Sequence, residues 1–119
     1  MRRLLIVEDH QDMQVMYRVI FRKCPDIEIV AQVTTAEEAL SILPDMRPDL
    51  IIVDISLPGM DGIMLISEIR TIYPDLKILV ATGHDPDRYL GAATRAGADG
   101  FLQKGDVGEI REKVYQLLG

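Results

Sequence analysis

Short apolar runs alternate along the chain with stretches in which apolar residues recur every three or four positions. Five runs predict β-strands, and three of these are continuously apolar, as expected of parallel strands that helices cover on both faces. The predicted strands are RLLIV (3–7), IEIVAQV (27–33), DLIIVD (49–54), LKILVAT (76–82) and GFLQK (100–104).

The stretches between and after these strands have the apolar period of amphipathic helices. One further helix is predicted over 86–96, where the pattern is weaker and Ala, Thr and Gly are frequent. The apolar positions of the stronger helices are Met13, Met16, Tyr17, Ile20 and Phe21, then Ala36, Ala39, Leu40 and Leu43, then Leu65, Ile66, Ile69 and Ile72, and finally Val107, Ile110, Val114, Leu117 and Leu118.

Local signals agree with these limits. Thr34 stands three residues before Glu37 and predicts a capping box, while Asp61 is placed to cap the helix that follows the third strand. Gly97 predicts a left-handed residue that ends the helix over 86–96. Pro74 falls after the third helix and before the fourth strand, where that helix should already have stopped.

The order is therefore β-α repeated five times, with short connections and no linker of biased composition, so we expect one domain over 1–119. Right-handed crossovers make this a doubly wound parallel α/β sheet, (βα)5, for which a common strand order is 2-1-3-4-5. That order leaves a crevice between the first and third strands. Ligand chemistry is expected at the carboxyl ends of the strands that flank it.

Composition narrows the function classes. Hydrophobic residues make up 48% of the 119 residues, and 19 acidic against 13 basic residues give a net charge of -6. With no basic block, we expect no direct nucleic-acid contact by this domain. The apolar runs are far shorter than the ~20 residues of a membrane span, and Glu8 and Asp9 interrupt the first run before it resembles a signal peptide. Together with the single Cys24, this predicts a soluble cytoplasmic protein without membrane contact.

Acidic residues lie on both sides of the predicted crevice. Glu8 and Asp9 end the first strand, and Asp54 ends the third. Two carboxylates about 4 Å apart repel by about 4 kcal/mol at an effective dielectric constant of 20, so three of them need a cation. Oxygen ligands of this kind suit Mg²⁺.

The neighbouring strands add two further polar groups at the same edge. Thr82 ends the fourth strand and Lys104 the fifth, and the small Ala81 and Gly83 leave room beside Thr82. Phosphoryl transfer needs mainly positioning and charge neutralisation, which Mg²⁺ and Lys104 would supply. The arrangement supports an aspartyl phosphate on Asp54.

Four stretches together resemble the receiver domain of two-component response regulators: LLIVEDH, LIIVDISLPGMDG, ILVATG and AGADGFLQK. The likeness covers essentially the whole chain and implies a flavodoxin-like fold. It implies that Asp54 is the phosphoacceptor and Asp9 a direct ligand of Mg²⁺, for which Mn²⁺ can substitute. Glu8 would act from the outer metal shell through water, and the carbonyl of Ser56 would be a further ligand.

The same resemblance implies a switch. Thr82 matches the switch hydroxyl, Lys104 the phosphate-binding lysine and Phe101 the aromatic residue that moves with the hydroxyl. The surface of the fourth helix, fifth strand and fifth helix would then change. A domain of this kind catalyses its own aspartyl phosphorylation and dephosphorylation but is not a turnover enzyme.

The implied partners are a sensor histidine kinase or phosphotransfer protein. A second copy is a further candidate, docking through the fourth helix, fifth strand and fifth helix or through the first and fifth helices. The EDH and KG stretches resemble receivers that precede LuxR-type helix-turn-helix output domains, and no such output domain is present within these 119 residues.

Two positions differ from the common receiver pattern, and several residues near the site have simpler structural explanations. Glu8 stands where many receivers have Asp, and Gly105 stands where many have Pro, so a cis peptide is not expected there. Asp9 or His10 is expected to cap the first helix in part. Ser56 and His84 are hypothesised to tune the access of water to the phosphoryl group.

Remaining loop and histidine residues have simpler interpretations. Neither His10 nor His84 is expected to bind a metal, because the additional Cys or His of a zinc site is missing. Pro58 and Gly59 are read as turn residues.

Three alternatives stay open. A haloacid-dehalogenase-like phosphatase needs a second Asp two residues after the nucleophile, where this chain has Ser56. A flavin-binding module needs a hydroxyl-rich and glycine-rich phosphate loop, where this chain has the acidic EDHQDM. A degenerate receiver would keep only protein contacts, although all five site positions carry competent residues.

Overall fold

The computed structural model describes residues 1–56, 61–83 and 86–119. Its strands form one parallel sheet in the order β2-β1-β3-β4-β5, which confirms the predicted (βα)5 topology. The elements are β1 (Arg2–Val7), α1 (Gln11–Arg22), β2 (Ile27–Val33), α2 (Ala36–Met46), β3 (Leu50–Asp54), α3 (Gly62–Ile72), β4 (Lys77–Thr82), α4 (Pro86–Ala96), β5 (Gly100–Gln103) and α5 (Val107–Leu118).

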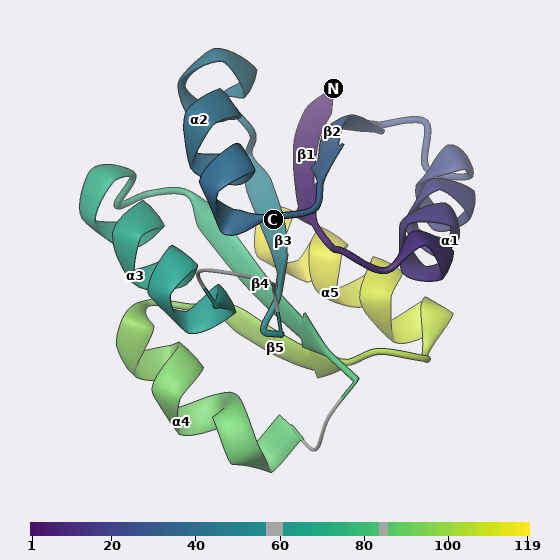
Figure 1. Ribbon diagram of the computed structural model, residues 1–119. Coiled ribbons are helices and arrows are strands. Elements are labelled where there is room, and N and C mark those ends of the chain that lie inside the picture. Colours follow the sequence, from purple (N-terminus) through teal and green to yellow (C-terminus); the bar gives the residue numbers. More distant parts are fainter. Residues whose placement is uncertain (57–60, 84–85) are drawn as a thin grey trace.

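Helices cover both faces of the sheet, with α2, α3 and α4 on one side and α1 and α5 on the other (Figure 1). Side chains alternate along each strand, so Leu5 and Val7 of β1 join the cluster under α2 and α3, while Leu4 and Ile6 join the cluster under α1 and α5. Burial on both sides explains why the central strands read as unbroken apolar runs.

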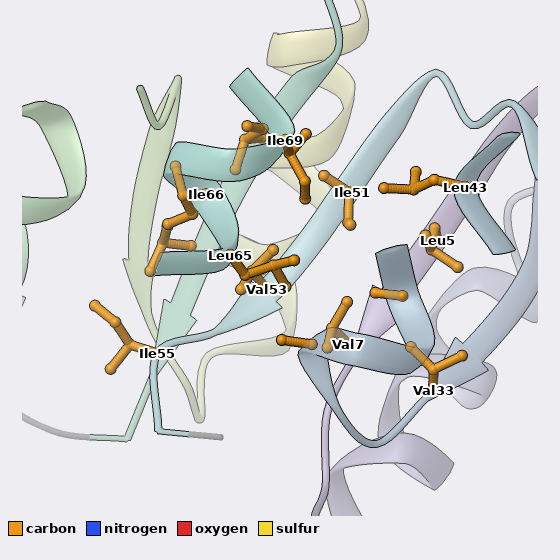
Figure 2. Close-up of a cluster of buried hydrophobic side chains, with 14 of the residues drawn as sticks. Leu5, Val7, Val33, Leu43, Ile51, Val53, Ile55, Leu65, Ile66 and Ile69 are labelled. Atoms are coloured by element: carbon orange, nitrogen blue, oxygen red, sulfur yellow. The ribbon is translucent and has the colours of Figure 1, made fainter. Parts of the chain in front are cut away.

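The cluster under α2 and α3 fixes α3 against the third strand. Figure 2 shows Leu65, Ile66 and Ile69 of α3 facing the sheet near Ile51 and Val53 of β3. All five side chains are fully buried. The strand that ends in Asp54 is therefore held by the core over its whole length.

The start of α2 differs by one residue from the prediction. Thr35, not Thr34, is the N-cap: its hydroxyl accepts a hydrogen bond from the backbone N–H of Glu38 at 3.1 Å. Glu38 in return accepts from the backbone N–H of Thr34 at 3.2 Å. The predicted Thr34 and Glu37 box was wrong because burying Ala36 against the sheet sets where the helix begins.

Other predicted helix ends are confirmed. Asp61 accepts a hydrogen bond from the backbone N–H of Met64 at 2.8 Å and so caps α3. Gly97 follows α4 with φ +120°, a conformation that favours glycine. Pro74 lies two residues beyond the end of α3.

The predicted side-chain cap of α1 is wrong. His10 is the N-cap residue, but no side chain donates or accepts a cap hydrogen bond there.

Some positions in the predicted apolar faces of the helices are not buried. Ile72, Met16 and Val107 are 59%, 41% and 39% exposed. Ile72 and Val107 are terminal residues of their helices, where the helix extends past the buried stripe. Within the described ranges, no helix combines the length and hydrophobicity of a membrane span.

Gly62 packs α3 directly against the end of β3. Its backbone N–H donates to the carbonyl of Ile55 at 3.1 Å. A Cβ at this position would lie 2.5 Å from the carbonyl oxygen of Asp54 and 2.7 Å from the Cα of Ile55. Both are backbone atoms that no rotamer change can move.

We therefore expect Gly62→Ala to destabilise the fold by about 1–3 kcal/mol, the usual cost of overpacking a close contact. Urea unfolding measures the change. Gly108→Ala in α5 is the matched control, because its Cβ would meet only an ordinary 3.5 Å contact with Asp106. Equal stability of the Gly62→Ala variant and the parent would show that the junction of α3 and β3 yields more easily than its geometry indicates.

Candidate functional site

Acidic side chains from two adjacent strands meet at the carboxyl edge of the sheet. β1 and β3 pair in parallel, with Val7 opposite Val53, so the residues that follow reach the same edge. Ligand atoms of Glu8, Asp9, His10 and Asp54 all lie within 4.8 Å of one another. The strand order thus brings together the three carboxylates that the sequence placed on either side of a crevice.

Lys104 is the cation inside this acidic cluster. Its Nζ lies 2.5 Å from Glu8 Oε1 and 3.1 Å from Asp54 Oδ2. The carboxyl side chains are 1% and 3% exposed, and that of Lys104 is 14% exposed. One ammonium group therefore compensates two buried carboxylates that end separate strands.

Asp54 is held by the chain on both of its oxygens. The backbone N–H of Ser56 donates to Oδ1 at 3.1 Å, and Lys104 donates to Oδ2. The pKa of Asp54 is nevertheless raised, first by burial and then by the negative charge of Glu8, against the lowering effects of Ser56 and Lys104. The carboxylate is rigidly placed, and its charge is only partly compensated.

His10 lies at the mouth of the same cluster. Its Nδ1 is 3.1 Å from Glu8 Oε2, 3.2 Å from Asp9 Oδ1 and 3.9 Å from Asp54 Oδ2. The hydrogen bond to Glu8 raises the pKa of His10, and the charges of Asp9 and Glu8 add to this effect. Its side chain is 67% exposed, so the imidazole faces the carboxylates from the solvent side.

The cluster has the character of a divalent-cation site. Asp9 Oδ1 is buried yet accepts no hydrogen bond from any described residue. Lys104 pairs with two of the three carboxylates, Glu8 and Asp54, so a further positive partner would relieve the repulsion within the cluster. Hard oxygen donors of this kind fit Mg²⁺ or Mn²⁺.

Thr82 ends β4 and Lys104 follows β5, so both lie at the carboxyl edge of the sheet beyond β3. Ala81 lies opposite Asp54, so Thr82 stands one residue further along the strand, where it is fully buried. The backbone N–H of Lys104 donates to the carbonyl of Thr82 at 2.7 Å. Phe101 pairs with Val80 in the sheet, and its half-buried side chain packs against the cluster under α2 and α3.

A cavity of about 750 Å³ opens over the acidic cluster. It is lined by polar residues of the cluster and its surroundings, among them Asp9, His10, Asp54, Ser56 and Lys104, and by the apolar Met13 and Met16 of α1. A further cavity of about 480 Å³ lies between the carboxyl-terminal ends of α2 and α3, away from these carboxylates. The first of these two cavities is the one that opens onto the carboxylates of the acidic cluster.

A sequence profile of the response regulator receiver domain matches residues 4–115. The chain belongs to the response regulator receiver domain family. Receivers of this family use Mg²⁺, which agrees with the donor set of the acidic cluster. The family match also confirms the resemblance inferred from the strand-end motifs.

Individual relatives agree with this assignment. The receiver is 32% identical over 117 residues, 98% of this chain and 55% of the relative, to the uncharacterized transcriptional regulatory protein YhcZ of Bacillus subtilis. A two-component response regulator of the LuxR family from Aurantimonas has a TM-score of 0.91 at 29% identity, covering 98% of this chain and 84% of that chain. A DNA-binding response regulator of the LuxR family from Staphylococcus aureus has a TM-score of 0.90 at 26% identity, with both chains fully covered. The receiver spans about half the length of the curated relatives that it matches.

Other residues singled out in the sequence do not join the carboxylates in the buried cluster. Ser56 is exposed and contributes its backbone N–H to Asp54. His84, like Pro58 and Gly59, lies outside the described residues. The position of His10 relative to Glu8 was not foreseen, because it depends on the turn between β1 and α1, and adjacency to Asp9 was the only signal.

The raised pKa of Asp54 predicts a pH-dependent stability. The folded receiver binds the Asp54 proton more tightly than the unfolded chain, so this group favours folding below its ordinary pKa of 3.8, and that contribution is lost as pH rises through the folded-state value. In chelator at neutral pH, Asp54→Asn is therefore expected to stabilise the receiver by on the order of 1 kcal/mol. Urea unfolding at neutral and acid pH should show the gain shrinking in acid.

Asp75→Asn is the matched control, since Asp75 is exposed in the turn before β4. We expect that change to stay within about 0.5 kcal/mol at either pH. Destabilisation by Asp54→Asn at neutral pH would mean that the ion pair with Lys104 outweighs the burial of the carboxylate.

Proposed function

We propose that this receiver is a phosphorylation-controlled switch of a two-component system, with Asp54 as phosphoacceptor. The donor is a phosphohistidine of a sensor histidine kinase or phosphotransfer protein, or a small phosphodonor. A carboxylate oxygen of Asp54 forms the new P–O bond while the P–N bond of the phosphohistidine breaks. The imidazole nitrogen leaves with the bonding electron pair, and the product is an aspartyl phosphate.

The observation that carries this proposal is the setting of Asp54. It ends a fully buried strand, and its two oxygens are held by the Ser56 N–H and the Lys104 ammonium group. It also faces a cavity large enough for a phosphoryl group. A carboxylate fixed in this way needs little reorganisation before attack, and positioning is the main requirement of phosphoryl transfer.

The acidic cluster would hold the divalent ion. Asp9 and Asp54 would be direct ligands of Mg²⁺, the backbone carbonyl of Ser56 would be a third, and Glu8 would lie in the outer shell. Bound there, the ion supplies positive charge to the phosphoryl oxygens. Lys104 supplies the second positive charge, exchanging its contact with Asp54 Oδ2 for one with the added group.

Thr82 and Phe101 are proposed as the switch. The hydroxyl of Thr82 would donate a hydrogen bond to the phosphoryl group, and Phe101 would move with it. Because Phe101 lies in β5 between α4 and α5, such a movement would alter the surface formed by α4, β5 and α5. Ser56 and His84 are proposed to tune the rate at which water attacks the phosphoryl group.

The output is proposed to lie in a further domain or a partner protein. The relatives are transcriptional regulators of about twice this length, and one solved relative is titled a DNA-binding response regulator. A receiver with a net charge of -6 would act on such an output through protein contacts in the cytoplasm rather than by touching DNA itself. Dimer formation through α4, β5 and α5, or through α1 and α5, is one way to transmit the change.

Incubation with acetyl phosphate and Mg²⁺ tests the phosphoacceptor. Intact mass spectrometry is expected to show one added phosphoryl group that hydroxylamine removes, and chelation of the metal should suppress it at least about tenfold because the cluster is then uncompensated. Asp54→Asn should abolish the modification.

Asp75→Asn serves again as the matched control and should be modified like the parent. An unmodified parent, or equal modification of the Asp54→Asn variant, would refute Asp54 as the phosphoacceptor.

Thr82→Val tests the switch, because it removes the hydroxyl and keeps the branched shape. The sequence contains two phenylalanines, so fluorophenylalanine labelling gives one NMR signal for Phe101 and one for the buried Phe21 as reference. Phosphorylation should shift the Phe101 signal in the parent. Losing a hydrogen bond of about 1 kcal/mol should weaken that population change roughly fivefold in Thr82→Val, with Asp54 still phosphorylated. An unchanged Phe101 response in the variant would remove Thr82 from the switch.

A further inference from the structure

His10 places an imidazole nitrogen among the carboxylates, in addition to the oxygen donors that the proposed metal site uses. Nδ1 lies 3.1 Å from Glu8 Oε2 and 3.2 Å from Asp9 Oδ1. Two ligand atoms in neighbouring positions around an ion at about 2.1 Å are separated by about 3 Å. The nitrogen thus already stands at the spacing of a ligand next to Asp9, which the proposed function makes a direct ligand.

The backbone fixes His10 in this place. Its N–H donates to Glu8 Oε2 at 3.1 Å, and its carbonyl accepts from the N–H of Gln14 at 3.0 Å as the first bond of α1. Gln14 Nε2 also donates to the carbonyl of Glu8 at 2.6 Å. The turn between β1 and α1 is tied at several points, so the imidazole needs little ordering to act as a ligand.

The two carboxylate oxygens of Glu8 have different partners, and Lys104 reaches only one of them. Lys104 contacts Glu8 through Oε1, whereas His10 contacts it through Oε2. Asp9 Oδ1, the buried oxygen without a hydrogen bond from a described residue, faces the same imidazole. An ion bound here would meet carboxylate oxygens and one nitrogen together.

We propose that His10 Nδ1 is a ligand of the divalent ion, which makes this a mixed nitrogen and oxygen site that favours a first-row transition-metal ion over Mg²⁺. The proposal rests on the metal site of the proposed function and adds one ligand to it. Imidazole binds Mn²⁺, Co²⁺ or Zn²⁺ readily, whereas Mg²⁺ is held by oxygen donors and water. The difference in affinity between Mn²⁺ and Mg²⁺ would therefore be larger here than in a site with oxygen ligands alone.

Mn²⁺ is the probe, because its electron spin echo envelope modulation reports directly bound ¹⁴N. At alkaline pH, which favours the neutral imidazole, the parent should show this modulation and His10→Ala should lose it. By calorimetry, His10→Ala should bind Mn²⁺ at least about tenfold more weakly, while Mg²⁺ affinity changes less than about threefold. The side chain of His10 is 67% exposed, so the variant is expected to fold.

Asp75→Asn is the control, because Asp75 is exposed in the turn before β4, at the opposite edge of the sheet from the acidic cluster. That variant should keep both the nitrogen modulation and the Mn²⁺ affinity. Modulation that survives in His10→Ala, or equal or tighter Mn²⁺ binding by it, would overturn the ligand assignment; tighter binding would mean that the imidazole acts as a competing cation.

Phosphorylation of the parent by acetyl phosphate with Mg²⁺ is measured on the same preparation. Mn²⁺ bound without nitrogen modulation, together with normal phosphorylation, would refute the role of His10 and leave the proposed function intact. Absence of both Mn²⁺ binding and phosphorylation would refute the metal site and the proposed function together.

Discussion

The contact of Lys104 with Glu8 and Asp54 is the interaction on which the site depends. It joins the ends of β1 and β3 to the residue after β5, and it places one cation between two carboxylates that are almost completely buried. Burying a charge without a partner costs several kcal/mol, so neither carboxylate would be stable there alone. The ion pairs also span the central strands, which makes the geometry of the site sensitive to the register of the whole sheet. Site and core are thus coupled through a single side chain.

The two edges of the sheet show what separates a structural polar network from a reactive one. At the amino edge, Arg70 donates to the carbonyls of Gly97 and Leu76 and pairs with Asp99, which also accepts from the N–H of Ile78. Donors and acceptors are matched there, and the network holds α3 and the loop before β5 in place. At the carboxyl edge Lys104 pairs with two of three carboxylates, and Asp9 Oδ1 lacks a hydrogen bond from a described residue. The carboxyl edge therefore carries uncompensated negative charge, and this imbalance is what supports the ion and phosphoryl chemistry proposed for it.

The strand pattern predicted most of the fold because the sheet is buried on both faces. Continuous apolar runs such as LLIV and LIIV cannot sit at a surface, and their number and spacing leave few topologies. The errors lie where local signals compete with packing. Thr34 was as good a cap as Thr35 by residue type, and burial of Ala36 decided between them. The helical stripe at Ile72 was correct in period, but the last turn of α3 extends beyond the surface that it covers.

The sequence by itself determined the (βα)5 order, the strand ends and therefore which residues could meet: Glu8, Asp9, Asp54, Thr82 and Lys104. It did so because strand ends and the parallel order follow from hydrophobic period and crossover handedness. Tertiary structure alone decided how these groups pair. Lys104 faces Oε1 of Glu8, and Nδ1 of His10 faces Oε2. These contacts depend on the turn between β1 and α1 and on the burial of the side chains at this low-dielectric edge of the sheet. The contact between Glu8 and Lys104 joins residues far apart in sequence, and the contact between Glu8 and His10 depends on how the turn folds, so the apolar pattern predicts neither.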